Sequence, residues 1–337
     1  MAALLEVEGL KTYFDTLDGV VKAVDGVSFS LNRGETLGIV GESGSAKSDT
    51  AMSLMRLIPM PPGRFAGGDV RFNGESVLEM SDSTVRSLRG NKIAMIFQDP
   101  MTSLNPVYRV GVQIGESLRL HQGMPKKKAY ERAVELLGTV GIPNPEQRAS
   151  EYPHQFSGGM RQRAMIAMAL ACDPDILIAD EPTTALDVTI QAQILELMME
   201  LQGRTGAAII MITHDLGVVA DMANNVMVMY AGKAVEYGSA DDVFYKSLHP
   251  YTWGLLDSLP RHDIDEKGRL CPIQGQPPSL IDVPPGCPFH PRCPYVRDIC
   301  RTEVPMFRAI NGEHGAACHF AGDPEFVRGC SLEVGVE

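Results

Sequence analysis

The chain has 337 residues, of which 44% are hydrophobic and 21% are charged, a balance that excludes an intrinsically disordered protein and indicates a globular one. Its formal net charge of −12 argues against nucleic acid as a partner, because the overall electrostatic field repels phosphates. The N-terminus has no signal-peptide pattern and no apolar run reaches about 18 residues. We therefore expect a cytosolic chain whose cysteines stay reduced.

The first elements predict a strand, a glycine-rich loop and a helix in direct succession. Residues 4–14 and 21–31 alternate apolar and polar side chains around Asp25-Gly26, which predicts antiparallel strands. Residues 34–41 form a short apolar strand that runs into the loop, and residues 46–58 have helical spacing. This succession is the context in which phosphate-binding loops occur.

The middle of the chain predicts a parallel sheet with crossover helices. Helical periodicity extends from about residue 110 to 172 and returns at 188–202, between two apolar strands. The strands expected here cover residues 92–98, 174–180 and 207–213, and a hairpin follows at 224–238. Beyond about residue 255, proline and cysteine become frequent and the periodicity fades, so we place a domain boundary there.

The loop GESGSAKS at residues 41–48 departs from the phosphate-loop pattern G-x-x-x-x-G-K-[ST] at one position, where Ala46 replaces the second glycine. Lys47 would contact the terminal phosphates, the Ser48 hydroxyl would ligate Mg²⁺, and backbone N–H groups of residues 43–48 would surround the phosphate oxygens. An ordinary glycine-rich turn is the alternative. The predicted nucleotide-binding residues of this loop are Gly41, Ser43, Gly44, Ser45, Ala46, Lys47, Ser48 and Asp49.

Two acidic residues follow a buried strand in the second half of the predicted site. Asp180 ends the apolar segment ILIAD, where it could hold Mg²⁺ through water, and Glu181 beside it could polarise an attacking water. An Asp-Glu-Pro sequence that merely ends a strand is the alternative. The glycine loop and the acidic pair, in this order and strand context, make a chance match improbable.

Further motifs resemble those of the ABC ATPases. FSGGMRQR at 156–163 is similar to the family signature LSGGQ, and KTYF places Phe14, with Tyr13 as a substitute, where the family keeps an adenine-stacking aromatic. Gln98 resembles the Q-loop glutamine, which would also approach Mg²⁺, and His214 resembles the switch histidine. The resemblance implies nucleotide contacts by Ser157, Gly158, Gly159 and the D-loop Asp187, and catalytic roles for Glu181, His214 and Gln98.

Nearly the whole chain resembles the ATPase subunits of bacterial dipeptide and oligopeptide importers, through FQDPMTSLNPVYRVG, HPYTWGLLDSLP and PPGCPFHPRCP. The resemblance implies an α/β P-loop NTPase fold at residues 1–255, with a RecA-like core, an antiparallel β subdomain and a helical signature subdomain at about 100–165. It also implies a peripheral location on the cytoplasmic face of the membrane. The implied partners are two membrane-spanning permease subunits, a second, related ATPase and, indirectly, an extracytoplasmic peptide-binding protein.

The C-terminal region, residues 256–337, is expected to hold a metal through Cys287, Cys293, Cys300 and Cys318. Four thiols in a cytosolic chain usually hold a metal centre, and gaps of five, six and seventeen residues are wider than those of zinc knuckles. The peptide-importer ATPases carry the same spacing, and there it is associated with a [4Fe–4S] cluster. Zinc and plain reduced cysteines are the alternatives.

Ala46 and Asp49 leave two interpretations of the loop open. A side chain at position 46 crowds the phosphates or forces an unusual backbone state that costs about 1–3 kcal/mol, and a carboxylate at position 49 repels phosphate if it faces it. The chain is then either an ATPase that binds ATP weakly without a partner, which we favour, or an impaired subunit that serves its partner through FSGGMRQR. The same motifs would also suit a nickel-importer subunit, a non-transport ABC ATPase or an inert scaffold.

Overall fold

The computed structural model describes residues 3–99, 103–183, 188–258 and 273–328. A small antiparallel sheet near the N-terminus has the strand order β2-β1-β4-β5. Its strands are β1 (Leu5–Thr16), β2 (Gly19–Leu31), β4 (Gly63–Phe72) and β5 (Glu75–Ser76). The antiparallel pairing of the first two strands was predicted, but the turn between them lies at residues 17–18, and Asp25-Gly26 falls within β2 at a shift in register.

The central sheet of eight strands has the order β11-β12-β10-β9-β3-β8-β7-β6. It contains β3 (Thr36–Val40), β6 (Ile93–Ile96), β7 (Ile176–Asp180), β8 (Ala208–Ile212), β9 (Asn225–Tyr230) and β10 (Lys233–Ser239). The neighbours β9-β3-β8-β7-β6 pair in parallel, as the apolar runs predicted, and every residue of β3, β6, β7 and β8 is buried. The carboxyl ends of these strands therefore meet at one edge of the sheet, which is where open α/β sheets bind ligands.

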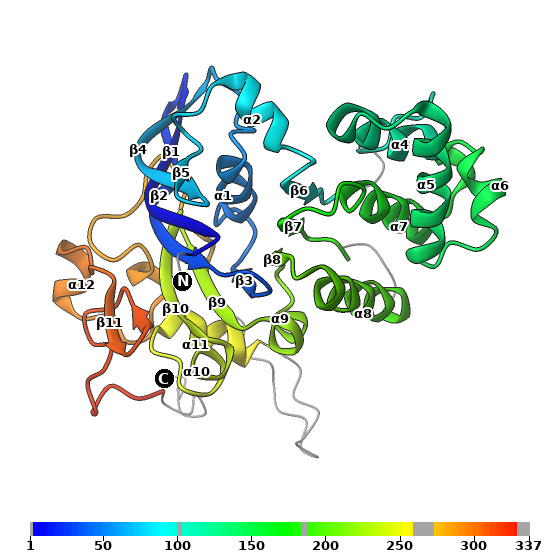
Figure 1. The fold of residues 1–337 in the computed structure, drawn as a ribbon. Helices are drawn as coiled ribbons and strands as arrows, with labels where there is room; N and C mark the ends of the chain where they lie inside the picture. Colours follow the sequence, from blue (N-terminus) through cyan, green and yellow to red (C-terminus); the bar gives the residue numbers. More distant parts are fainter. Residues whose placement is uncertain (1–2, 100–102, 184–187, 259–272, 329–337) are drawn as a thin grey trace, which may run out of the picture.

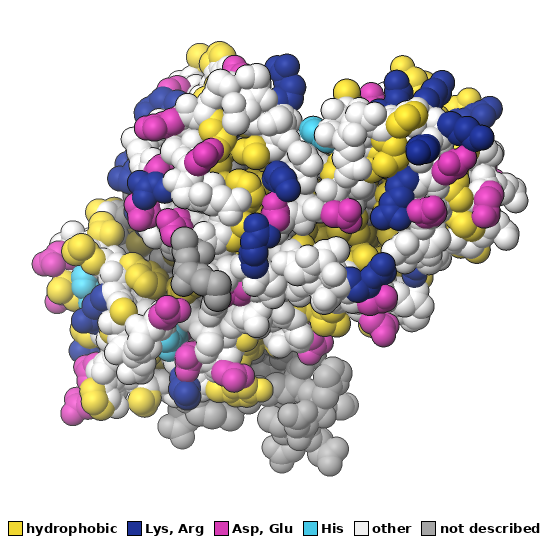
Figure 2. All heavy atoms as spheres, in the orientation of Figure 1, with side chains coloured by type: hydrophobic (Ala, Val, Ile, Leu, Met, Phe, Trp, Pro, Cys, Tyr) yellow, Lys and Arg dark blue, Asp and Glu magenta, His cyan; other side chains and the backbone are white. Residues whose placement is uncertain are grey.

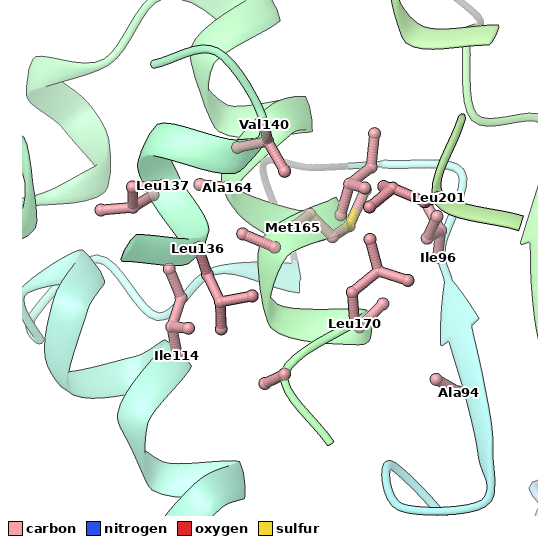
Figure 3. Close-up of a cluster of buried hydrophobic side chains, with 14 of the residues drawn as sticks. Ala94, Ile96, Ile114, Leu136, Leu137, Val140, Ala164, Met165, Leu170 and Leu201 are labelled. Carbon is pink, nitrogen blue, oxygen red and sulfur yellow. The ribbon is translucent and has the colours of Figure 1, made fainter. Parts of the chain in front are cut away.

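Helices cover this sheet and form a separate lobe beside it (Figure 1). Those near the sheet are α1 (Lys47–Leu54), α2 (Asp82–Leu88), α8 (Val188–Thr205) and α9 (Leu216–Met222). The helical lobe holds α4 (Val110–Gln122), α5 (Lys126–Thr139), α6 (Pro145–Ala149), the 3₁₀ turn η1 (Pro153–Gln155) and α7 (Gly158–Ala169). Its buried side chains, among them Ile114, Leu137 and Met165, continue without interruption to Ile96 of β6 (Figure 3). The lobe is thus packed onto the strand that leads to Gln98.

The C-terminal region lies beside β10 and extends the central sheet (Figure 1). It follows α10 (Ala240–Tyr245) and α11 (Pro250–Asp257) and contains η2 (His290–Arg292), α12 (Asp298–Thr302), β11 (Arg308–Asn311) and β12 (His314–Ala316). β12 pairs antiparallel with β10, which the fading periodicity of this region did not predict. In the described residues, no helix is both long and apolar enough to cross a membrane.

Candidate functional site

The glycine loop connects β3 to α1, and its conformation depends on Ala46. Ala46 is the residue before the first helical residue Lys47 and has φ 70° and ψ 32°, in the left-handed region. Glycine adopts this region freely, whereas a Cβ there is disfavoured. Of the two effects considered for a side chain at position 46, the structure shows the unusual backbone state. The Ala46 side chain is buried, only 7% exposed.

Lys47 is buried, and its ammonium group is held by the loop itself. Nζ donates to the carbonyl of Gly41 at 2.8 Å and to that of Glu42 at 3.2 Å. Burial lowers the pKa of Lys47, while the nearby carboxylates of Glu181, Asp180 and Glu42 oppose that shift. The ammonium therefore sits among acceptors that a phosphate oxygen could replace.

Ser48 and Asp180 come together from α1 and the end of β7. The Ser48 hydroxyl donates to Oδ1 of Asp180 at 3.0 Å. Burial raises the pKa of Asp180, and the charges of Glu181 and Asp49 raise it further, against the bond from Ser48 and the charge of Lys47. A hydroxyl and a buried carboxylate with an unfavourable negative charge suit a hard divalent cation such as Mg²⁺.

Glu181 lies between the two other predicted catalytic residues. Gln98, after β6, donates from Nε2 to Glu181 Oε2 at 2.9 Å, and Nδ1 of His214, after β8, lies 3.3 Å from Glu181 Oε1. Glu181 itself has a positive φ of 47° and a side chain that is only 12% exposed, whereas the His214 side chain is 60% exposed. Three strand ends thus bring the predicted glutamine, glutamate and histidine into one group.

Asp49 occupies the first turn of α1 next to this group. Burial raises the pKa of its carboxyl, and its charge acts on Asp180. The backbone carbonyl of Asp49 accepts from the Ser53 hydroxyl at 2.6 Å. The carboxylate therefore adds negative charge on the side of α1 where the cation would lie.

The Ser45 side chain offers the loop a polar group that a ligand could bind. Its hydroxyl oxygen is buried and has no hydrogen-bond partner within the described parts of the chain. A buried polar atom without a partner is costly, and a phosphate oxygen would relieve it. Together with Lys47, Ser48 and Asp180, this atom makes the loop fit a nucleotide with Mg²⁺.

The signature residues begin α7 at the surface of the helical lobe. Ser157 caps the helix by accepting from the Met160 N–H at 3.3 Å, while Phe156 before it is buried. Ser157 and Gly158 are exposed, and a Cβ added at Gly158 would meet no atom within 4 Å. An open helix N-terminus of this kind attracts anions.

The remaining predicted nucleotide contacts are placed only in part. Phe14 is half-buried near the end of β1, whereas the Tyr13 hydroxyl donates to Asp25 at 2.7 Å and Arg64 lies over its ring. Tyr13 is thus engaged elsewhere, and adenine stacking by Phe14 stays a prediction. Asp187 lies outside the described residues.

The structure does not support the predicted four-cysteine metal site. Across residues 3–99, 103–183, 188–258 and 273–328, no group of three or more His, Cys, Asp or Glu side chains is arranged to hold a metal ion. Some of these cysteines nevertheless lie close together, because the Cys287 N–H donates to the Cys300 carbonyl at 2.8 Å. Burial raises the pKa of Cys287 to about 11 and that of Cys293 to about 12, and the other cysteines add to both shifts. None of the four is in a disulfide.

The sequence did not predict a set of residues from the C-terminal part of the chain that hold the glycine loop. Glu42 accepts two hydrogen bonds from Arg292, at 2.6 and 2.9 Å, and its backbone N–H donates to the hydroxyl of Tyr251 at 2.8 Å. Arg292 lies 250 residues from Glu42 along the chain. No local pattern signals such a pair.

The fold and the geometry at these strand ends define an ATPase of the ABC class. The ABC transporter family matches residues 24–184, and the family described as oligopeptide/dipeptide transporter, C-terminal region, matches residues 235–300. A solved structure of the ATP-binding cassette MJ0796 bound to ADP and Pi is similar, with a TM-score of 0.64 and 25% identity, over 70% of this chain and 98% of that chain.

Curated relatives extend the similarity along the chain. The chain is 55% identical over 303 residues to the oligopeptide transport ATP-binding protein OppD of Salmonella typhimurium, which covers 90% of both chains. It is 52% identical over 318 residues to the dipeptide transport ATP-binding protein DppD of Bacillus subtilis, over 94% of this chain and 95% of the relative. The chain belongs to the ATP-binding subunits of the peptide ABC transporters.

Proposed function

We propose that this subunit powers peptide import by binding MgATP at the loop of residues 41–48 and hydrolysing it at Glu181. The observation that carries the proposal is the convergence of four strand ends on one site. Ser48 contacts Asp180 at 3.0 Å, and Gln98 and His214 both contact Glu181, at 2.9 and 3.3 Å. The intact acidic pair and histidine favour an active ATPase over an impaired or inert one.

The chain's own residues divide the work as follows. The Lys47 ammonium group leaves the backbone carbonyls of Gly41 and Glu42 to bind the terminal phosphates. Ser45 supplies a hydroxyl that has no hydrogen-bond partner in the described structure. Ser48, Asp180 and Gln98 would hold Mg²⁺, which neutralises charge on the phosphate oxygens. Glu181 orients the attacking water and accepts its proton, while His214 and Gln98 fix the position of its carboxylate.

The signature of a second ATPase subunit completes the site in this proposal. Ser157 and Gly158 are exposed at the N-terminus of α7, where the first N–H groups of a helix can bind an anion. We propose a head-to-tail pair in which this turn faces the γ-phosphate of a related, second ATPase. The similar ABC transporter cassette MJ0796 is dimeric in its solved structure, with a TM-score of 0.63 and 25% identity, which supports the pairing.

The helical lobe is the proposed contact with the permease subunits on the cytoplasmic face of the membrane. Figure 2 shows Lys and Arg side chains gathered on this lobe, although the chain as a whole is acidic. A mainly apolar cavity of 510 Å³ lies between α4 and α5, and Val107 and Tyr108 are exposed near the start of α4. Exposed apolar surface of this kind marks interaction sites.

Glu181→Gln tests the assignment of the hydrolytic residue. The amide cannot accept the proton of water, so phosphate release by the assembled transporter should fall by about a hundredfold or more while ATP still binds. Glu200→Gln, on the exposed face of α8, is the matched control and should leave the rate unchanged. Unaltered turnover in Glu181→Gln would remove the glutamate from the mechanism.

We propose separately that Cys287, Cys293, Cys300 and Cys318 take up a metal, with a [4Fe–4S] cluster ahead of zinc. The proposal rests on the four free thiol donors and on their spacing along the chain, not on their present arrangement. Iron and zinc analysis of anaerobically purified chain tests it, with Cys172→Ser as the control because that cysteine lies in the core near α7. Protein that carries neither metal in stoichiometric amount ends the proposal.

A further inference from the structure

Glu42, the second residue of the glycine loop, is bonded through every polar group it has. Its N–H donates to Tyr251, and its carbonyl accepts from the Ser45 N–H at 3.2 Å and from Lys47 Nζ at 3.2 Å. Its carboxylate receives both outer nitrogens of Arg292, the two-pronged geometry that fixes orientation as well as distance. The end of the loop that follows β3 is thus held by residues outside the loop.

The groups that hold Glu42 are themselves immobilised. The Arg292 side chain is only 4% exposed, donates from Nε to the carbonyl of Gln274 at 2.9 Å, and lies 5.8 Å from the centre of the Tyr230 ring. Tyr230 and Tyr251 are completely buried, with ring centres 4.6 Å apart, and Phe289 packs edge-on against both. A fixed anchor transmits position, whereas a mobile surface ion pair does not.

These contacts connect the C-terminal region to the groups that meet phosphate. Glu42 supplies one of the two carbonyls that hold Lys47, and the same carbonyl accepts from the N–H of Ser45, whose hydroxyl has no partner in the described structure. Displacement of Glu42 would therefore move both residues. We name Glu42, Tyr251 and Arg292 the loop latch.

We propose that Arg292 and Tyr251 are positioning residues for the phosphate-binding loop, so that the C-terminal region sets the ATP affinity of the ATPase core through Glu42. The inference rests on the proposed role of residues 41–48 in binding phosphate. It goes beyond that role because it assigns a part in nucleotide binding to two residues outside the phosphate-binding loop. The latch holds the backbone of Glu42 in place when Lys47 leaves its carbonyl for a phosphate.

The test measures loop order and ATP affinity separately in the full chain. Arg292→Ala should speed hydrogen exchange of the amides of residues 41–48 without nucleotide. It should also weaken ATP binding by about tenfold or more, because both charge-assisted hydrogen bonds to the Glu42 carboxylate are lost. Arg292→Lys keeps the charge but loses the two-pronged contact, so its ATP dissociation constant should fall between those of the wild type and Arg292→Ala. Arg328→Ala is the matched control, because Arg328 pairs with Asp257 away from the loop.

A double-mutant cycle of Arg292→Ala and Glu42→Ala distinguishes positioning from a general structural effect. If the two residues act only as a pair, the double variant should lose no more ATP affinity than the weaker-binding of the two single variants. Additive losses, unchanged amide exchange, or faster exchange with unchanged affinity would each overturn the latch. If Arg292→Ala does not fold, Arg292→Lys and Tyr251→Phe decide by the same readouts.

Different experimental results would refute the proposed function and the loop latch. Lys47→Ala should abolish ATP binding, and a wild-type chain that binds no ATP refutes the assignment of the loop. In that case amide exchange alone decides whether Arg292 orders residues 41–48. A wild type that binds ATP, together with an Arg292→Ala variant of equal affinity, refutes the latch alone.

Discussion

Ala46 is the residue at which this loop departs from its pattern, and the structure shows how the chain accommodates it. The alanine takes the left-handed conformation that the pattern reserves for glycine, which costs about 1–2 kcal/mol for an L-residue. The strain is concentrated one residue before Lys47, where α1 begins without a side-chain cap. We therefore expect alanine at this position to destabilise the loop conformation.

Ala46→Gly should raise the free energy of unfolding by about 1 kcal/mol, because glycine adopts φ 70° without strain. It should also tighten ATP binding, since the loop then reaches its conformation without backbone strain. Chemical denaturation and calorimetry measure the two effects. Ala51→Gly, in the buried interior of α1, should lower stability instead and serves as the control. Equal ATP affinity with alanine and glycine at position 46 would remove the steric argument.

At the scale of elements, β10, α11 and β12 are joined by one buried carboxylate. Glu236 is completely buried and accepts from the N–H groups of Leu248 and His249, from the Thr252 hydroxyl and from the His314 ring. His249 caps α11 by accepting from the Tyr251 N–H at 3.0 Å. The loop latch therefore depends on a helix whose start is fixed by buried polar groups.

Burial lowers the pKa of His249 to about 3 from its ordinary value of 6.5. At pH values between about 3 and 6.5, the unfolded chain therefore protonates this histidine and the folded chain does not. The free energy of unfolding should fall as the pH drops from about 6.5 toward 3. His249→Asn keeps a capping acceptor and removes the titrating group, so its stability should decline less over the upper part of this range. Urea denaturation at pH 7 and at pH 5 measures how much the free energy of unfolding falls between the two pH values. An equal fall in the wild type and in His249→Asn would contradict the assignment to His249.

How far the sequence predicts these elements depends on how local their causes are. The apolar runs of β3, β7 and β8 reveal strands by themselves, and the residues after them gave Asp180, Glu181 and His214. β11 and β12 have only four and three residues and no apolar alternation, and they form because β10 offers an edge. The pair of Arg292 and Glu42 is likewise a product of tertiary structure. The metal predicted from cysteine spacing has no support in the arrangement of the thiols.

At the scale of the whole molecule, the ATPase core and the C-terminal region share one sheet. β12 pairs with β10, His314 contacts Glu236, and Arg292 reaches the glycine loop. The boundary predicted near residue 255 from composition stays a prediction about domains, but no break in the sheet accompanies it within the described strands.

A chain that ends at residue 258 should therefore be less stable than the full chain and prone to associate. It exposes the edge of β10 and leaves Glu236 without its histidine, both of which are unfavourable. Thermal unfolding and light scattering measure the effect, against a control chain that ends at residue 328 and keeps both strands. A monomeric shorter chain with an unchanged melting temperature would show that the region folds separately.

The strand order also has a consequence for how the protein is made. β3 lies between β8 and β9, so the strand that leads into the glycine loop finds its neighbours only after residues 208–230 have left the ribosome. Arg292 emerges later still. Non-local pairing of this kind slows folding and leaves apolar strands uncovered meanwhile. During translation, the nascent loop should therefore gain its nucleotide-binding shape near the end of synthesis, and chaperones would have the longest contact with β3.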